Sequence, residues 1–303
     1  MRFATAGLRP IEPYRAALLA ARPPSGAAAH ARPPIVPEYQ IDRSVGVGIV
    51  TAAFLGLSSR PDDYYILPAE DLYRQSPVPA FIFTQAEQQC RFAAPTYPAD
   101  PELLADAFWR PGWREIYQKL IRRNPTHCYS RQRHYPQVLG AWLGKFELLR
   151  RVFDDPRFGN LDALLWWDAG FSISFHFGHD PSRYRGFEID PAAAVQSLRD
   201  LLRHPVALAH CPFGTFHMPA AWMEPYRPPA PSRSSLTYPA MFIFVRRDAF
   251  DDLYARVREA WARLIADGKA GTEENALTLY AWGREVRSFD SGAWERMLGF
   301  RVK

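Results

Sequence analysis

The sequence predicts an α/β fold in which a mostly parallel central sheet is flanked by helices. Short β-branched and aromatic runs alternate with longer segments of helical periodicity, an order typical of layered α/β proteins. The run from Ala163 to Trp167 has no polar break, as expected for a strand buried on both faces of a parallel sheet. The chain has 303 residues, enough to bury the core of one large domain or two small ones.

In the first half of the chain, composition separates an arm from the folded region. Residues 1–43 are rich in Ala, Pro and Arg, which predicts a flexible N-terminal arm. Four prolines between 92 and 111 predict a loop. The elements expected around that loop are a strand at 45–53, irregular chain leading into a short helix at 62–74, a strand at 79–84, a short helix at 85–90 and a helix at 113–122.

Apolar periodicity and capping residues define the second half. An apolar stripe predicts a long helix at 137–153. Asp190 before Pro191 is a typical helix start, and Thr272 is a natural N-cap with Asn275 at the capping-box position. The other expected elements are strands at 163–167, 206–209 and 241–245, a proline-rich loop at 211–239, and helices ending at 202, spanning 248–265 and spanning 273–282.

Composition excludes several classes of protein. The net charge of +5, from 37 basic and 32 acidic residues, comes without the basic stripe expected of a nucleic-acid-binding protein. Three widely spaced cysteines without a C-x-x-C motif argue against a disulfide framework or a zinc ribbon. No apolar run approaches the ~20 residues of a membrane span, and no convincing signal peptide is present. We therefore expect a cytoplasmic protein with at most peripheral contact with the inner membrane.

Asp168 is the first candidate for a functional residue. It ends the hydrophobic run and is followed by Ala169 and Gly170. Ligands bind open α/β sheets at the carboxyl ends of the strands, where an acid can reach a substrate or a metal. The alternative is that Asp168 merely caps the next turn.

The other motifs admit both a functional and a structural interpretation. His176 and His179, together with Asp168, could hold a metal. His210 and His217 flank Cys211, which suggests a nucleophile and its base, although a buried inert thiol is the simpler account. The glycines of 45–48 lie within or before the strand, which rules out a dinucleotide-binding fingerprint.

Three further candidates belong to helices and the central strand. Glu273 and Glu274 favour helix initiation, and one of them could also face the site as a base. Lys145 could reach a phosphate, with a solvated surface lysine as the alternative. Trp142, Trp166 and Trp167 are expected in the core, although an indole beside Asp168 could stack on a sugar or base.

Several of these segments together resemble a known family. The segments 49–53, 81–84, 165–170 and 271–277, with the helix that carries Lys145 between them, occur in the order seen in the bacterial HtrL/YibB (WlaTC-like) glycosyltransferase family. The resemblance covers residues 45–290 and implies a glycosyltransferase-A-like single domain at 44–303. It also implies transfer of a sugar from a nucleotide-sugar donor to a glycan, lipid-linked or other hydroxyl acceptor, as in polysaccharide biosynthesis.

The resemblance also implies roles for individual residues. Asp168 would contact a divalent cation (manganese or magnesium) or the ribose, Thr51 and Thr84 would lie near the nucleotide, and Glu273 or Glu274 would lie on the acceptor side. A cation or basic side chains stabilise the departing diphosphate, and a carboxylate takes the acceptor proton in an inverting enzyme.

The chain also departs from the family pattern. Such enzymes usually carry an Asp-x-Asp motif, whereas Ala169 and Gly170 follow Asp168 here, so metal dependence stays open. Arg246 and Arg247 could replace the metal as phosphate clamps. The loop at 211–239 would set the choice of acceptor if it is a lid.

A nucleotide-sugar-dependent glycosyltransferase is thus the leading hypothesis. A glycosyltransferase-like domain that binds without catalysis is the second. A small metallo-hydrolase built on Asp168, His176 and His179 is the third.

Overall fold

The structure is a computed structural model, and it describes residues 43–302 with interruptions. The residues not described within that span are 58–59, 110–111, 124–134, 171–172, 174–179, 213–222, 230–235, 270, 285, 291–295 and 297. The predicted arm, apart from residue 43, therefore lies outside the described residues, as do His176, His179, His217 and Cys128.

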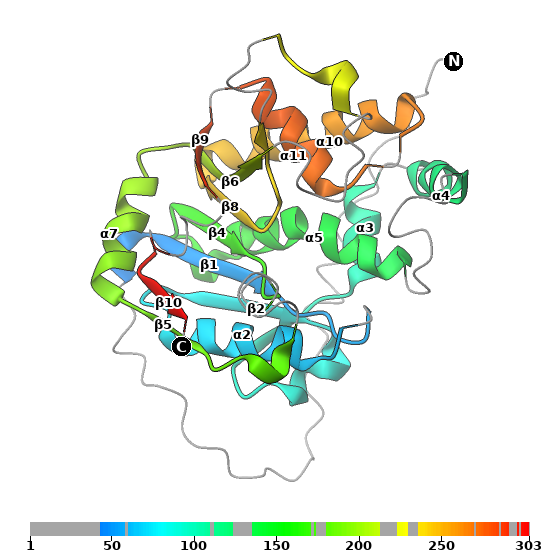
Figure 1. Cartoon of the computed structure of the whole chain (residues 1–303). Helices are drawn as coiled ribbons and strands as arrows, with labels where there is room; N and C mark the ends of the chain where they lie inside the picture. Colours follow the sequence, from blue (N-terminus) through cyan, green and yellow to red (C-terminus); the bar gives the residue numbers. More distant parts are fainter. Residues whose placement is uncertain are drawn as a thin grey trace.

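An eight-stranded sheet forms the centre of the molecule (Figure 1). Its order is β3-β2-β1-β4-β8-β6-β7, with β9 paired to β6. All pairings are parallel except β4 with β8, β8 with β6, and β6 with β7. The strands are β1 (Val47–Ala52), β2 (Ala80–Thr84), β3 (Thr96–Pro98), β4 (Ala163–Trp167), β6 (Val206–Pro212), β7 (Leu236–Thr237), β8 (Phe242–Arg246) and β9 (Arg287–Asp290). The predicted α/β domain with a mostly parallel sheet is confirmed.

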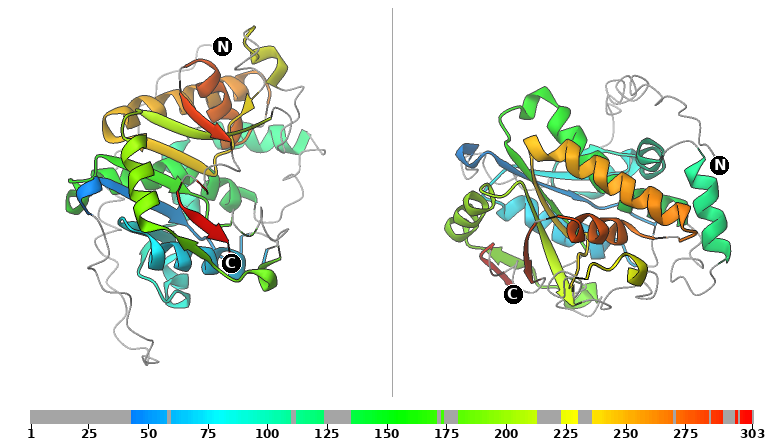
Figure 2. Two further views of the ribbon diagram at one scale, coloured as in Figure 1. Left: turned by 60° about the vertical axis from the view of Figure 1, so that its left-hand side comes forward. Right: turned by 90° about the horizontal axis from the view of Figure 1, so that it is seen from above.

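Helices cover both faces of this sheet (Figures 1 and 2). One face packs against α3 (Pro101–Phe108), α4 (Trp113–Arg123), α5 (Tyr135–Asp154), α10 (Arg247–Ala266) and α11 (Glu273–Trp282). The other packs against α2 (Asp63–Gln75), α7 (Pro191–Leu201) and a small antiparallel sheet of β5 (Phe187–Ile189) and β10 (Phe300–Val302).

The central strand β4 explains the unbroken apolar run in the sequence. Leu164 and Trp166 belong to the core on the α5 face, whereas Leu165 and Trp167 belong to the core on the α2 and α7 face. All five residues of β4 are buried. The strand is apolar throughout because it has no solvent face.

The prediction of a loop at 92–111 is wrong. It contains β3 and α3, and the Asp100 carboxylate accepts hydrogen bonds from the backbone N–H groups of Glu102 and Leu103. Pro101 occupies the first turn, where a missing N–H costs nothing. The proline that indicated a loop therefore starts a helix.

Other segments differ from expectation in extent. The segment at 62–74 is almost entirely the 13-residue helix α2. The expected loop at 211–239 begins and ends in paired strands, because Cys211 of β6 pairs with Thr237 of β7. The short strands β5, β9 and β10 were not predicted. They are three or four residues long, too short to show a period.

Two glycines set the position of α5, the helix that carries Lys145. A Cβ on Gly140 would lie 2.0 Å from the backbone oxygen of Pro101, and one on Gly144 would lie 2.7 Å from Leu104 Cδ1. The missing side chains therefore let α3 and α5 pack in close contact.

Two expectations from composition concern cysteines and membranes. Cys90 is exposed and Cys211 is buried, and neither forms a disulfide. Among the described helices, none is long and apolar enough to span a bilayer.

Candidate functional site

The candidate site lies at one edge of the sheet. Because β1, β2, β4 and β6 run parallel, their carboxyl ends meet there, together with the amino end of the antiparallel β8. Asp168 directly follows β4, and its backbone N–H donates to the Met241 carbonyl at 2.9 Å. This is the edge where open α/β sheets bind ligands.

Asp168 combines the two roles considered from the sequence. Its Oδ1 accepts a hydrogen bond from the Gly170 N–H at 3.1 Å, which caps the turn. Its Oδ2 lies 3.6 Å from Lys145 Nζ. The side chain keeps 37% of its surface exposed, so it can still contact a ligand.

Lys145 is not a solvated surface lysine. Its side chain is only 5% exposed. Its Nζ donates to Glu273 Oε1 at 2.9 Å and to the Ala240 carbonyl at 3.1 Å, and lies 5.8 Å from the Trp166 ring centre. The alternative of a solvated surface lysine is therefore wrong, because Lys145 is the buried centre of the site.

The amino end of α11 brings Glu273 to Lys145. Asn275 Oδ1 accepts from the Thr272 N–H at 2.6 Å, as the predicted capping arrangement requires. The Tyr117 hydroxyl donates to the Gly271 carbonyl at 2.6 Å and anchors the preceding turn. Glu273 is buried, and its Oε2 has no hydrogen-bond partner within the described part of the chain.

The site raises the pKa values of both Lys145 and Glu274, with different consequences for their charge. Burial lowers the pKa of Lys145, but the charges of Glu273 and Asp168 outweigh burial and raise it overall, so the ammonium stays charged. Burial and the charge of Glu273 raise the pKa of Glu274 to about 8, while Lys145 opposes the shift. Glu274 is thus a carboxyl group that gains and loses its proton near neutral pH.

Glu274→Gln is expected to change how stability depends on pH. The unfolded Glu274 loses its proton near its ordinary pKa of 4.5, whereas the folded group holds it until about pH 8. The folded state therefore binds more protons between these values, so the contribution of Glu274 to stability falls as pH rises through this window. Urea unfolding at pH 5 and pH 8.5 should show the variant gaining stability relative to wild type at the higher pH. An equal difference at both values would contradict the raised pKa.

The cluster around Lys145 does not include the side chains of Thr51, Thr84 and Trp167. Thr51 and Thr84 have no exposed surface, and the Thr84 hydroxyl donates to the Ala53 carbonyl at 2.7 Å. Trp167 is 1% exposed and packs against Phe300 and Phe187. In this arrangement neither threonine side chain nor the Trp167 indole is part of the surface that a ligand can contact.

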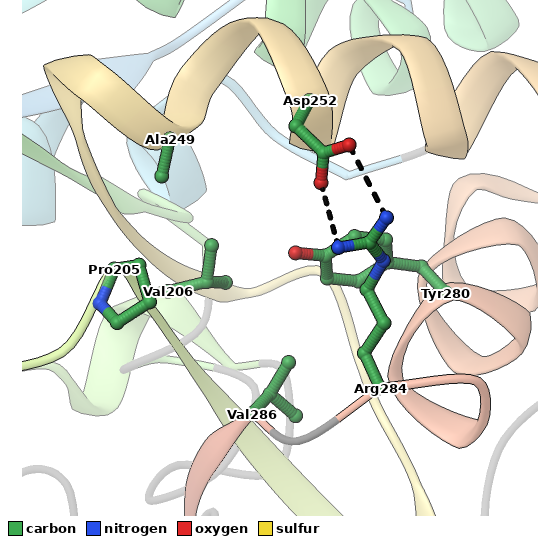
Figure 3. A pocket seen from close by; sticks show the side chains of 7 residues that line it. All are labelled: Pro205, Val206, Ala249, Asp252, Tyr280, Arg284 and Val286. Atoms are coloured by element: carbon green, nitrogen blue, oxygen red, sulfur yellow. Dashed lines mark hydrogen bonds and ion pairs between the residues drawn. The ribbon is translucent and has the colours of Figure 1, made fainter.

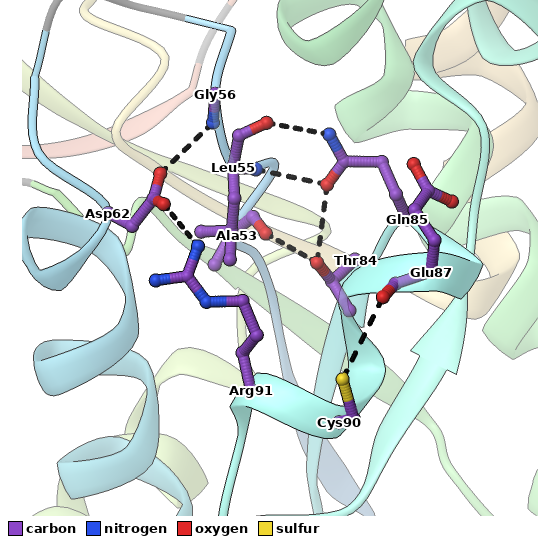
Figure 4. A network of polar contacts seen from close by, with 9 residues as sticks. All are labelled: Ala53, Leu55, Gly56, Asp62, Thr84, Gln85, Glu87, Cys90 and Arg91. Atoms are coloured by element: carbon purple, nitrogen blue, oxygen red, sulfur yellow. Dashed lines mark hydrogen bonds and ion pairs between the residues drawn. The ribbon is translucent and has the colours of Figure 1, made fainter.

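Thr84 instead belongs to a polar network that holds the chain after β1 (Figure 4). The Gln85 amide accepts from the Leu55 N–H at 3.0 Å and donates to the Leu55 carbonyl at 2.9 Å. Asp62 accepts from the Gly56 N–H at 3.0 Å and pairs with Arg91. The network fixes the connection from β1 beside the ligand-binding edge.

Arg246 and Arg247 cannot act as phosphate clamps at this edge. Arg246 is the last residue of β8 and Arg247 follows it, and this end of β8 lies at the opposite edge because Arg246 pairs with Ala163 at the start of β4. Arg246 forms an ion pair with Asp248. The Arg247 guanidinium donates to the backbone carbonyls of Leu161 and Phe158 at 2.9 and 3.0 Å.

His210 lies at the same edge as Asp168, on the next strand but one. Its register partner is Asp290 of β9. Burial lowers the pKa of His210 and the charge of Asp290 raises it, with a lowered pKa as the result. Cys211 Sγ donates to the Thr237 carbonyl at 3.7 Å, in agreement with a buried structural thiol. Asp290 could not be connected with this edge beforehand, because β9 was not predicted.

The donor set of the described residues does not fit a divalent cation. No group of three or more His, Cys, Asp and Glu side chains in the described ranges is arranged to hold a metal. The Lys145 ammonium occupies the space between the Asp168 and Glu273 carboxylates. The proposed histidine ligands, His176 and His179, lie outside the described residues.

A separate cavity of about 210 Å³ lies at the opposite edge (Figure 3). It is lined by Pro205 and Val206 at the start of β6, and its charged groups are the ion pair between Arg284 and Asp252 at 2.9 Å. The charges of Arg284 and Asp252 neutralise each other within this cavity.

Comparison with known proteins adds little to this description. No family model matches the chain, and no curated protein matches it. Among solved structures, the chain is similar to the apo crystal structure of mouse xyloside xylosyltransferase 1, with a TM-score of 0.45 and 9% sequence identity. The similarity covers 85% of this chain and 94% of that chain.

Proposed function

We propose that the protein is a glycosyltransferase that moves a sugar from a nucleotide-sugar donor to a hydroxyl acceptor such as a glycan. The observation that carries the proposal is the exposed Asp168 carboxylate beside the buried Lys145 at the ligand-binding edge of the sheet, with Glu274 near enough for the charges of both to affect its pKa. The resemblance to the HtrL/YibB family supports the same reaction class.

Glu274 is suited to act on the acceptor. A general base works best when its pKa lies near the working pH, and the pKa of Glu274 is raised to about 8. In its ionised form it can take the proton of an attacking hydroxyl group, which is what an inverting transfer requires. Activity is therefore expected to rise with pH toward 8.

Asp168 is suited to act on the donor sugar. Positive charge develops on the sugar ring as the bond to the leaving group breaks, and a nearby carboxylate stabilises it. Lys145 donates to Glu273, which fixes both groups and keeps the charge of Glu273 balanced. Glu273 and Lys145 are thus positioning residues, because neither has enough exposed surface to contact a substrate.

The donor can be found with a thermal-shift screen of the full chain against UDP-, GDP-, CMP- and dTDP-sugars. A ligand at ~100 times its dissociation constant adds about 2.7 kcal/mol to the free energy of unfolding, which raises the melting temperature visibly. A shift with one nucleotide, followed by its release in the presence of a glycan acceptor, would support the proposal. A shift without turnover would favour the non-catalytic binding domain, and no shift with any donor would contradict the glycosyltransferase proposal.

A further inference from the structure

We propose that the ammonium of Lys145 takes the place of a divalent cation between the carboxylates of Asp168 and Glu273, so that this site does not hold a metal. The proposal deepens the proposed function, because it concerns the charge that an Asp-x-Asp glycosyltransferase obtains from manganese or magnesium. It rests on what surrounds Lys145 Nζ.

The surroundings of Nζ consist of oxygen atoms from three separate elements. They are Glu273 Oε1 at 2.9 Å, the Ala240 carbonyl oxygen at 3.1 Å and Asp168 Oδ2 at 3.6 Å. Carboxylate and carbonyl oxygens are the ligands that hard divalent cations prefer. These three oxygen atoms form a cage that has the chemistry of a cation site, and the Lys145 ammonium group from α5 fills this cage.

An ammonium and a metal ion cannot share this cage. A divalent cation needs oxygen ligands at 2.0–2.6 Å, and the Lys145 side chain already occupies the centre while adding a repulsive positive charge. The side chain is 5% exposed, so it cannot swing into solvent without leaving Glu273 unpaired. Glu273 Oε2, which has no hydrogen-bond partner among the described residues, is a further oxygen that a cation could use if the lysine were removed.

The packing around Gly170 agrees with a site that holds no metal. In the Asp-x-Asp pattern the second acid contributes to metal binding, whereas here Gly170 stands at that position. A Cβ on Gly170 would lie 2.4 Å from a carbon of the Tyr64 ring, so this packing has no room for an acid. The missing second acid and the buried lysine therefore both argue against a metal at this site.

Manganese binding to the full chain tests the proposal without a known donor. The electron paramagnetic resonance signal of free Mn²⁺ is titrated with wild-type protein and with Asp168→Ala. We expect wild type to remove no more of the signal than the variant removes. Manganese binding by wild type that Asp168→Ala abolishes would overturn the proposal. A failed donor screen would leave this result unaffected, so the two proposals fail separately.

Removing the lysine should turn the cage into a metal site. Lys145→Ala is expected to bind Mn²⁺ at least 10-fold more tightly than wild type, and adding Asp168→Ala should reverse the gain. Lys119→Ala, on the exposed side of α4, is the control and should behave as wild type. A folded Lys145→Ala protein without tighter manganese binding would overturn the proposal. If that variant does not fold, the wild-type titration alone decides.

Discussion

Asp168→Ala is expected to reduce sugar transfer by roughly 10²–10³-fold or more, the usual effect of removing one preorganised electrostatic group from an active site. Its carboxylate is the part of the Lys145 cluster with a clearly exposed surface, at 37%, and it lies at the ligand-binding edge. The effect should appear in kcat, because the interaction with the developing positive charge forms only in the transition state.

The fold of this variant should remain intact. Lys145 keeps its contacts with Glu273 and Ala240, so no buried charge is left alone. Asp248→Ala is a matched control, because Asp248 is an exposed acid at the opposite edge. Turnover of the identified donor and far-ultraviolet circular dichroism measure the two properties. Full activity of Asp168→Ala would remove the main support for the proposed function.

Lys145→Met is expected to cause the largest loss of stability, about 3–5 kcal/mol, the range for breaking a buried ion pair by removal of one partner. The methionine fills much of the same volume, but it leaves Glu273 as a buried, uncompensated carboxylate. Urea unfolding at pH 7 measures the loss. Lys119→Met, at an exposed position, should stay within about 0.5 kcal/mol of wild type.

A second substitution separates lost charge from lost packing. Adding Glu273→Gln removes the buried charge that Lys145→Met leaves without its partner, so the double variant should recover part of the stability at pH 7. A loss that Glu273→Gln does not reduce would show that Lys145 acts through packing alone.

Local patterns were sufficient for most of the long elements. The apolar run of β4, the stripe of α5, and the caps at Asp190 and Thr272 all gave correct elements, because each pattern reflects contacts within a few residues. The prolines at 92–111 led to the wrong prediction of a loop, since a proline in the first turn of a helix and a proline in a loop look alike in sequence. The three-residue strand β5 is too short to show the alternation of apolar and polar residues that predicts a strand.

The candidate site was predicted in part. The position of Asp168 at a strand end and of Glu273 and Glu274 at a helix start could be inferred locally, and both features meet at one edge. The sequence did not show that the Thr84 and Trp167 side chains are buried, because burial depends on what packs against each strand. Arg246 and Arg247 were placed at the wrong edge because nothing in the sequence shows that β8 runs antiparallel to β4.

The α/β layering, the boundaries of the long helices and the acid after the central strand follow from the amino-acid order, since periodicity and capping act over short distances. The role of Lys145 does not. Its partners Glu273 and Ala240 are 128 and 95 residues away along the chain, and the glycines of α5 act on a different helix. A buried lysine is stable only when oxygen atoms from distant segments surround it, and that condition exists only in the folded chain.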